Sequence, residues 1–280
     1  MTVGDINILV VSDGHFKLDG GQSFGIVPKI LWRRLAQPDR NNRLVIGLNC
    51  FLIQCGNTNI LVDTGIGTKL SSFLTKRYSA KAGELRYGLK KHGLDFKDID
   101  YVILTHLHFD HSGGCTKVDR TGSLIPAFPK ATYYVQENSL LEARNPTERG
   151  KRSYKEEDFE PLEEAGQLEL LYGESEPIPG VHVIETGGHC KGHQIILLTQ
   201  GGEKIAYLGD LVPTPYHLNP ICTSAYDRFP EDSATMKEDI LKMAIKEGWL
   251  IIFSHGYENS AGYLEAVSYT HLTLPTILLV

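Results

Sequence analysis

Short apolar runs separated by turn residues dominate the first third of the chain. Residues 6–14 (INILVVSDG) and 49–65 (NCFLIQCGNTNILVDTG) are apolar and β-branched, with Asp-Gly and Gly-Asn turn signals, so both predict strands. Between them, residues 16–42 combine glycines, aromatic residues and chain breakers. This composition predicts a long ordered loop of the kind that often carries function. The pattern of Ala82–His92, followed by Gly93, predicts a helix.

Further strands alternate with polar stretches in the rest of the chain. Residues 101–106 and 131–136 predict two strands, whereas residues 144–165 are polar and charged and predict a solvated surface excursion. An amphipathic helix is expected at about Glu231–Glu247. Four more strands are expected at residues 180–188, 194–200, 204–210 and 249–256. Because no repeat or linker interrupts residues 1–266, we expect one domain of mixed β and α layers.

Composition and charge exclude several kinds of partner. The 280 residues are 41% hydrophobic and 22% charged, as in an ordinary globular protein. The net charge is −6 and the densest basic spots, Arg33–Arg34 and Lys90–Lys91, are isolated pairs. We therefore expect no nucleic-acid partner, and no basic cluster that would bind an anionic substrate.

The chain also predicts a cytoplasmic location. Its N-terminus, MTVGDINILVVSDG, lacks the basic, apolar and cleavage regions of a signal peptide. No apolar run approaches the ~20 residues of a membrane span, so no membrane contact is expected. Five cysteines without a Cys-x-x-Cys pair suit reduced thiols in a cytoplasm.

The candidate chemistry lies at the ends of predicted strands. Residues 102–114 (VILTHLHFDHSGG) place three histidines and an aspartate directly behind an apolar run, and three later strands also end in ligand-type residues. Side chains alternate in an extended segment, so His106 and His108 share one side and suit one ion. Asp110 and His111, in the following turn, suit a second ion. The potential ligands are His106, His108, Asp110, His111, His189, Asp210 and His255.

The types of these side chains restrict the metal. Five imidazoles and two carboxylates without a thiolate suit Zn²⁺, with Mn²⁺, Co²⁺ or Fe²⁺ as alternatives. Two such ions ~3.5–4 Å apart would generate and orient a hydroxide for attack on an ester-like bond. The sequence therefore predicts two divalent metal ions per chain.

These motifs carry a family resemblance. THLHFDHSGG resembles the His-x-His-x-Asp-His signature of the metallo-β-lactamase superfamily, and LVDTG, TGGHCKGH, LGD and SHG stand around it in the family's order, over residues 5–260. The resemblance implies an α+β fold, a four-layer αββα sandwich with the metal site along one edge of the sheets. It implies that His106, His108 and His189 hold the first metal, that Asp110, His111 and His255 hold the second, that Asp210 bridges both, and that Asp63 and His193 orient ligands by hydrogen bonds.

Two segments narrow the resemblance. DGGQSFGIVPKILW and GDLVPTPYHLNPICTSAYDRFP resemble the quorum-quenching lactonases and, more distantly, the methyl-parathion-hydrolase-like enzymes. The implied reaction is hydrolysis of an N-acyl-homoserine lactone ring, in which a metal-bridging hydroxide attacks the carbonyl carbon. Asp110 would pass a proton to the leaving alkoxide.

The chain departs from the best-characterised homoserine lactonases three residues after Asp210, where they place a tyrosine and this chain has Pro213. Help to the oxyanion would then come from Tyr216, His217 or Tyr226, or be absent. The expected substrate is a small molecule with an apolar acyl group, and a homodimer is one possible assembly. Phe24 and Trp32, in the glycine-rich loop, either line the acyl pocket or pack that loop onto the core.

Several alternatives share the fold. A persulfide dioxygenase would use one iron and would not need Asp110 and His111 as ligands. A thioesterase of the glyoxalase II type would need a C-terminal helical extension, and a phosphotriesterase-like hydrolase would use the same pair of metals. A metal-binding scaffold without activity would have lost one or more of the seven ligands, all of which are present here.

The end of the chain has a different character. Residues 267–276 (VSYTHLTLPT) resemble the translated read-through of a sequencing adapter, so we expect residues 1–266 to form the hydrolase domain and residues 267–280 to be a non-native tail with few contacts. His271 is then not a metal ligand. The alternative is a genuine terminal strand, which the β-propensity of the tail permits.

Overall fold

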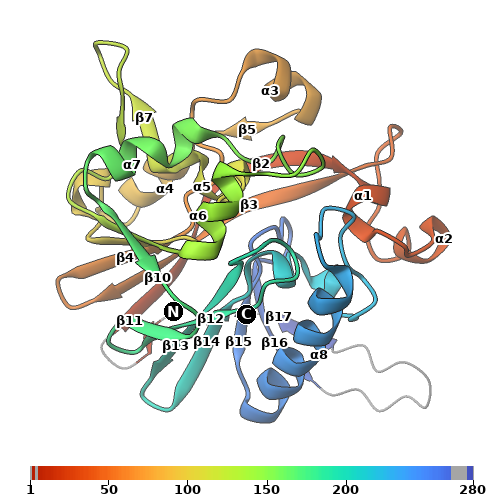
Figure 1. The fold of residues 1–280 in the computed structure, drawn as a ribbon. Coiled ribbons are helices and arrows are strands. Elements are labelled where there is room, and N and C mark those ends of the chain that lie inside the picture. Colours follow the sequence, from red (N-terminus) through yellow and green to blue (C-terminus); the bar gives the residue numbers. More distant parts are fainter. Residues whose placement is uncertain (1, 4–5, 266–275, 280) are drawn as a thin grey trace.

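Two large sheets lie face to face in the computed structural model, which describes residues 2–3, 6–265 and 276–279 (Figure 1). In the described chain the first sheet has the order β1-β2-β3-β4-β6-β9-β10, with β5 paired to β2. Its strands are β1 (Thr2–Val3), β2 (Ile6–Asp19), β3 (Arg43–Cys55), β4 (Thr58–Val62), β5 (Lys81–Ala82), β6 (Tyr101–Ile103), β9 (Thr132–Gln136) and β10 (Leu168–Leu171).

The second sheet contains later strands in sequence order, from β11 to β17. They are β11 (Ser175–Ile178), β12 (Val181–Glu185), β13 (Gln194–Gln200), β14 (Glu203–Tyr207), β15 (Leu250–Ile252), β16 (Ala261–Glu265) and β17 (Thr276–Leu279). A separate hairpin joins β7 (Thr116–Val118) to β8 (Leu124–Pro126).

Helices cover the outer face of each sheet (Figure 1). Leucines of α4, α6 and α7 pack into the core of the first sheet, and Ile240, Leu241 and Ala244 of α8 pack into that of the second. The α+β, four-layer αββα sandwich is therefore confirmed. The helices are α1 (Gly20–Phe24), α2 (Lys29–Trp32), α3 (Ser72–Tyr78), α4 (Leu85–Lys90), α5 (Phe109–Ser112), α6 (Glu137–Arg144), α7 (Glu160–Glu164) and α8 (Pro230–Glu247).

The central strands are apolar on both faces because each face is buried. In β3, Phe51 and Ile53 belong to the core between the sheets, whereas Cys50 and Leu52 belong to the core under the helices. Successive side chains of a strand point to opposite faces, so a strand between two cores reads as a continuous apolar run. The predicted strands are confirmed for this reason.

Three local predictions differ from the structure. The long loop predicted at residues 16–42 contains the end of β2 and the short helices α1 and α2. The helix predicted at Ala82–His92 is shorter, α4, because the chain first makes a turn in which Gly83 has φ +87°. The stretch 144–165 is not a solvated excursion, since Tyr154, Phe159 and Leu162 are buried in the core of the first sheet. Its many charged residues lie around these apolar anchors, which the overall polarity of the stretch concealed.

Strand direction gathers the predicted ligands at one edge. β12 is antiparallel to β13, β13 is antiparallel to β14, and β14 is parallel to β15. The carboxyl ends of β12, β14 and β15 therefore lie at the same edge of the second sheet. His189, Asp210 and His255 follow these ends, and the histidine-rich loop follows β6 of the first sheet.

The tail lies mostly outside the described residues, which resume at Thr276. Residues 276–279 form β17, which pairs antiparallel with β16. This pairing agrees with the alternative interpretation, in which the chain ends in a strand. The non-native origin of residues 267–280 stays a prediction. No helix in the described part of the chain has the length and apolar character needed to cross a membrane.

Candidate metal centre

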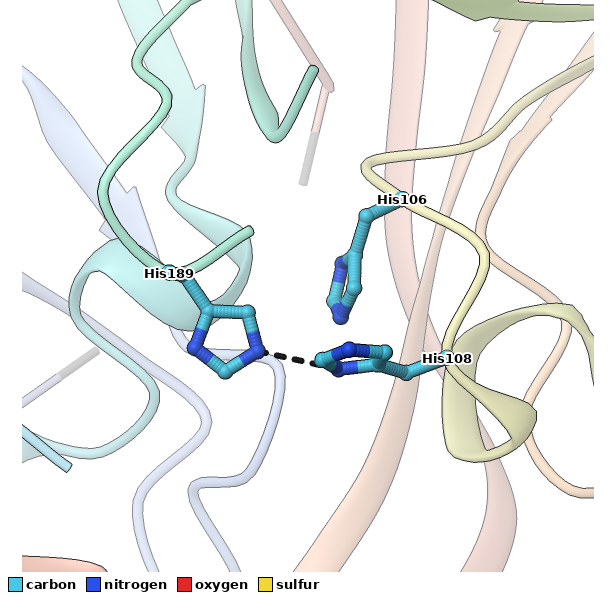
Figure 2. A group of neighbouring side chains, drawn as sticks. All are labelled: His106, His108 and His189. Carbon is cyan, nitrogen blue, oxygen red and sulfur yellow. Dashed lines mark hydrogen bonds between the residues drawn. The ribbon is translucent and has the colours of Figure 1, made fainter. Parts of the chain in front are cut away.

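Three buried histidines from two loops form the first cluster of the site, and Figure 2 shows their rings turned toward one another. His106 and His108 follow β6, and His189 follows β12. Nε2 of His189 lies 3.0 Å from Nδ1 of His108. Nε2 of His106 is buried and has no hydrogen-bond partner among the described residues. A buried ring nitrogen without a partner is costly, so this cluster fits a cation.

Asp210 connects the first cluster to a second one. Its Oδ2 lies 3.3 Å from Nε2 of His189, while its Oδ1 lies 3.2 Å from Nε2 of His111 and 3.2 Å from Nε2 of His255. Oδ2 of Asp110 is 3.6 Å from the same nitrogen of His255. The two oxygens of Asp210 therefore face two different groups of ligand atoms.

Burial and neighbouring charge set the protonation states in the centre. Burial, reinforced by the adjacent histidines, lowers the pKa of His106 and of His108 well below the usual value. Both rings are then neutral, which is the state that binds a metal. Burial alone would raise the pKa of Asp210, but the three histidines that face it outweigh burial and hold the pKa well below the usual value. Burial would lower the pKa of His111, His189 and His255 as well, but Asp210 outweighs burial and raises it. A bound ion would take the place of the protons on these three rings, and imidazoles around an ionised carboxylate are the donor set that a divalent ion of the zinc type prefers.

Asp63 holds the histidine-rich loop in place. Its Oδ2 lies 2.7 Å from Nδ1 of His111, and its Oδ1 accepts the backbone N–H of Thr105 at 2.8 Å. The Nδ1–H of His111 is therefore the donor, and Nε2 is left for a ligand. Asp63 itself has φ +57°, a left-handed conformation that is uncommon outside glycine. The strained backbone is stabilised by these buried hydrogen bonds.

His193 supports Asp210 through the backbone. Nε2 of His193 accepts the backbone N–H of Asp210 at 3.0 Å, so the ring proton is on Nδ1, 2.6 Å from the hydroxyl of Thr186. Burial lowers the pKa of His193 to about 3, which keeps the ring neutral. Because both nitrogens are engaged, the structure places His193 as a support of Asp210.

Asp227 was missed by the sequence analysis. Its Oδ1 lies 2.8 Å from Nδ1 of His189, and its carboxylate is buried. It stands next to Tyr226 in a segment already noted for its resemblance, but nothing in its spacing marked it as a partner of His189. The carbonyl of Gly47, which accepts the Nδ1–H of His255 at 2.8 Å, carries no signal in sequence at all.

A cavity of about 310 Å³ opens above the two clusters. Asp110 lies on its floor with 13% of its side chain exposed, and the carboxylate has no hydrogen bond within the described residues. The cavity has an apolar wall that includes Phe16, Leu18, Ile46 and Phe109. Tyr78, which sequence reasoning did not single out, lines the cavity together with Tyr226.

The predicted substrate residues fall into two groups. Phe24 and Trp32 are buried and stack on each other at 5.4 Å, and Phe24 also stacks on His217 at 4.6 Å. They pack the glycine-rich loop, and Phe24 shares a second hollow with Tyr216. Only His217 and Tyr226 of the five line the cavity within the described chain.

The side chains of these two cavity residues are fixed in different ways. His217 donates from Nε2 to the carbonyl of Ser23 at 2.9 Å, and burial lowers its pKa to about 4. The hydroxyl of Tyr226 donates to Oε1 of Gln22 at 2.8 Å. His217 therefore serves as a neutral anchor of the loop, whereas Tyr226 keeps its hydroxyl near the cavity.

The expected absence of a basic cluster is wrong. Arg77, Arg149 and Arg152 line the same cavity, although they come from two distant segments. Arg77 lies in the last turn of α3, next to Tyr78, and the other two lie in the loop after α6. The sequence shows them as scattered charges because only the fold brings the two segments together.

Comparison with known proteins supports a common architecture. The family model described as the Metallo-beta-lactamase superfamily matches residues 45–255. The crystal structure of a probable metal-dependent hydrolase from Staphylococcus aureus is 32% identical, with a TM-score of 0.90, and the similarity covers 100% of this chain and 98% of that one.

Relatives of lower identity include proteins described as lactonases. An N-acyl homoserine lactonase from Bacillus sp is 26% identical over 226 residues, which cover 76% of this chain and 82% of that protein. The structure of AidC, a dizinc quorum-quenching lactonase in complex with a product, is 18% identical, with a TM-score of 0.81 and coverage of 99% of this chain and 96% of that one. At that identity the second likeness shows the fold alone.

Proposed function

The chain is a metal-dependent hydrolase that belongs to the metallo-β-lactamase superfamily, and from this premise we propose that it opens lactone rings with two divalent metal ions, zinc in the first place. His106, His108 and His189 would hold one ion, and Asp110, His111 and His255 the other. Asp210 would bridge them.

One observation supports this assignment above the others. The two oxygens of Asp210 face different ligand groups, Oδ2 toward His189 and Oδ1 toward His111 and His255. A site for one ion would need only one of these faces. The full set of seven ligands also favours two ions over the single iron of a persulfide dioxygenase.

Bound ions of this kind supply an activated water and polarise a carbonyl oxygen. The residues of the chain would do the rest. Asp110, free of hydrogen bonds in the described structure and open to the cavity, would carry a proton to the leaving oxygen. Asp63, His193 and Asp227 would orient the ligands.

Characterised homoserine lactonases have a tyrosine at the position of Pro213, and another tyrosine at the cavity would take its role in this chain. Tyr226 is the candidate from the sequence, since Tyr216 lines the second hollow instead. Burial, then Tyr78 and Asp110, raises the pKa of Tyr226 to about 12, so the hydroxyl keeps its proton at neutral pH. It would donate this proton to an oxyanion by giving up its hydrogen bond to Oε1 of Gln22.

Lactones are proposed as substrates because the relatives named above include N-acyl homoserine lactonases, and because the cavity offers an apolar wall for an acyl chain. The test is a hydrolysis panel of N-acyl-homoserine lactones, phosphotriesters and thioesters, run with metal analysis. We expect the lactones to react fastest with two zinc-like ions per chain, and His106→Ala to lose both metal and activity. A single iron with consumption of persulfide, or fastest hydrolysis of a thioester, would contradict the proposal.

A further inference from the structure

Three arginines line the cavity above the candidate metal centre. Arg77 comes from the end of α3, and Arg149 and Arg152 come from the loop after α6. All three side chains are exposed at the cavity. Apolar side chains of the first sheet, among them Phe16, Leu18 and Ile46, line the same cavity, and Tyr78, next to Arg77, packs against Phe16.

These arginines have no carboxylate partner in the described residues. Arg149 donates to the carbonyl of Ala225, and the guanidinium of Arg77 lies 5.9 Å from the ring centroid of Tyr78. Elsewhere in the fold, Arg43 and Arg86 each pair with an aspartate. The cavity arginines therefore keep most of their N–H donors for another group.

The acidic groups of the cavity do not compensate these charges. Asp110 and Asp210 lie on its floor, and under the proposed function both are ligands of divalent cations. With two ions in place, the floor is no longer negative. Three guanidinium groups around one cavity then repel one another and attract an anion, although the whole chain has a net charge of −6.

We propose that the substrate carries an anionic group, a carboxylate or a phosphate, at the end remote from the bond that is cleaved. The planar guanidinium fork binds such oxyanions in two-point contacts. Arg77 and Arg152 would hold the anion, and the apolar wall would contact the chain between it and the scissile ester. This proposal rests on the proposed function. It replaces the expected wholly apolar acyl group with one that is apolar in the middle and charged at its end.

The test compares two ligands of similar length that differ in terminal charge. They are the lactam analogues of N-glutaryl- and N-hexanoyl-homoserine lactone, which keep the shape of the lactone but resist hydrolysis. Binding to the metal-loaded protein is measured by calorimetry at low and high salt. The variant is Arg77→Gln/Arg152→Gln, and the control is Arg120→Gln, an exposed arginine before the start of β8 that does not line the cavity.

We expect the glutaryl analogue to bind about tenfold more tightly at low salt, which corresponds to ~1.4 kcal/mol. The difference should disappear in the double variant and at high salt, and persist in Arg120→Gln. Equal binding of both analogues, or a difference that the double variant retains, would overturn the proposal. The corresponding lactones separate it from the proposed function: tight binding of the glutaryl lactam without hydrolysis of either lactone would leave the anion site in place and refute the lactonase.

Discussion

At the scale of single residues, the candidate metal ligands are easier to predict than the groups that hydrogen-bond to them. The seven candidate ligands stand in one dense motif and directly after apolar strands, so His106 or Asp210 can be identified from spacing. Asp227 could not, because its contact with His189 depends on a loop that returns to the site. The same is true of Arg77 and Arg152, which meet only in the folded chain.

Asp227→Asn should weaken metal binding about 10–100-fold, the usual effect of losing a partner of a ligating histidine. Asparagine keeps an acceptor for the Nδ1–H of His189 but removes the negative charge. Metal affinity is measured by competition with a chelator, and the control is Asp239→Asn, on the exposed side of α8. Unchanged affinity in Asp227→Asn would show that this carboxylate does not tune the site.

Asp110→Asn should lower the turnover by at least ~10², the usual contribution of a general acid. The substitution preserves shape but removes the group that carries the proton. Because Asp110 is also a proposed ligand, turnover is expressed per bound metal, and the melting temperature reports on the fold. A rate within a few-fold of the wild type would remove Asp110 from the mechanism.

At the scale of elements, the strands were predictable and the connections were not. An apolar run such as residues 49–55 identifies a strand whatever lies on either side of it. The prediction for residues 144–165 was wrong because the polar composition of this stretch conceals the buried Tyr154, Phe159 and Leu162. The turn after each strand sets the direction of the candidate ligand that follows it. Between β14 and Asp210 this turn contains Gly209, which has φ +52°.

Gly209→Ala should destabilise the fold by about 2–4 kcal/mol. A methyl group there would lie 2.7 Å from Nε2 of His193 and 3.0 Å from Cγ2 of Thr105, which adds overpacking to the strain of a left-handed conformation. The matched control is Gly201→Ala, with φ +60° and no atom within 4 Å of the added carbon, which should cost only about 1–2 kcal/mol. Urea denaturation of both variants measures the difference, and equal losses would show that the contacts of Gly209 are unimportant.

At the scale of the whole molecule, the candidate metal centre connects the two sheets. His106, His108, Asp110 and His111 follow a strand of the first sheet, and the remaining ligands follow strands of the second. The sequence predicted mixed layers, and the family resemblance implied their order. The pairing itself, such as parallel β4 and β6, joins segments too far apart in the chain for local patterns to specify.

Removal of the metals should therefore lower the stability of the entire fold. Without cations, buried ring nitrogens such as Nε2 of His106 lack partners, and the two sheets lose a link between them. Binding at ~1,000 times the dissociation constant contributes ~4 kcal/mol, which for a chain of this size corresponds to about 10 °C in melting temperature.

The measurement is a thermal melt with and without a chelator, followed by addition of Zn²⁺ to restore the original value. The control is His106→Ala/His189→Ala, whose melting temperature should respond less to the chelator than that of the wild type, because its first cluster has lost two of three histidines while the second remains. A wild-type melting temperature that does not respond to the chelator, in protein shown by metal analysis to have lost its ions, would contradict this role. The sheets would then be held by their shared apolar core alone, and the ligands would be arranged without any help from the metal.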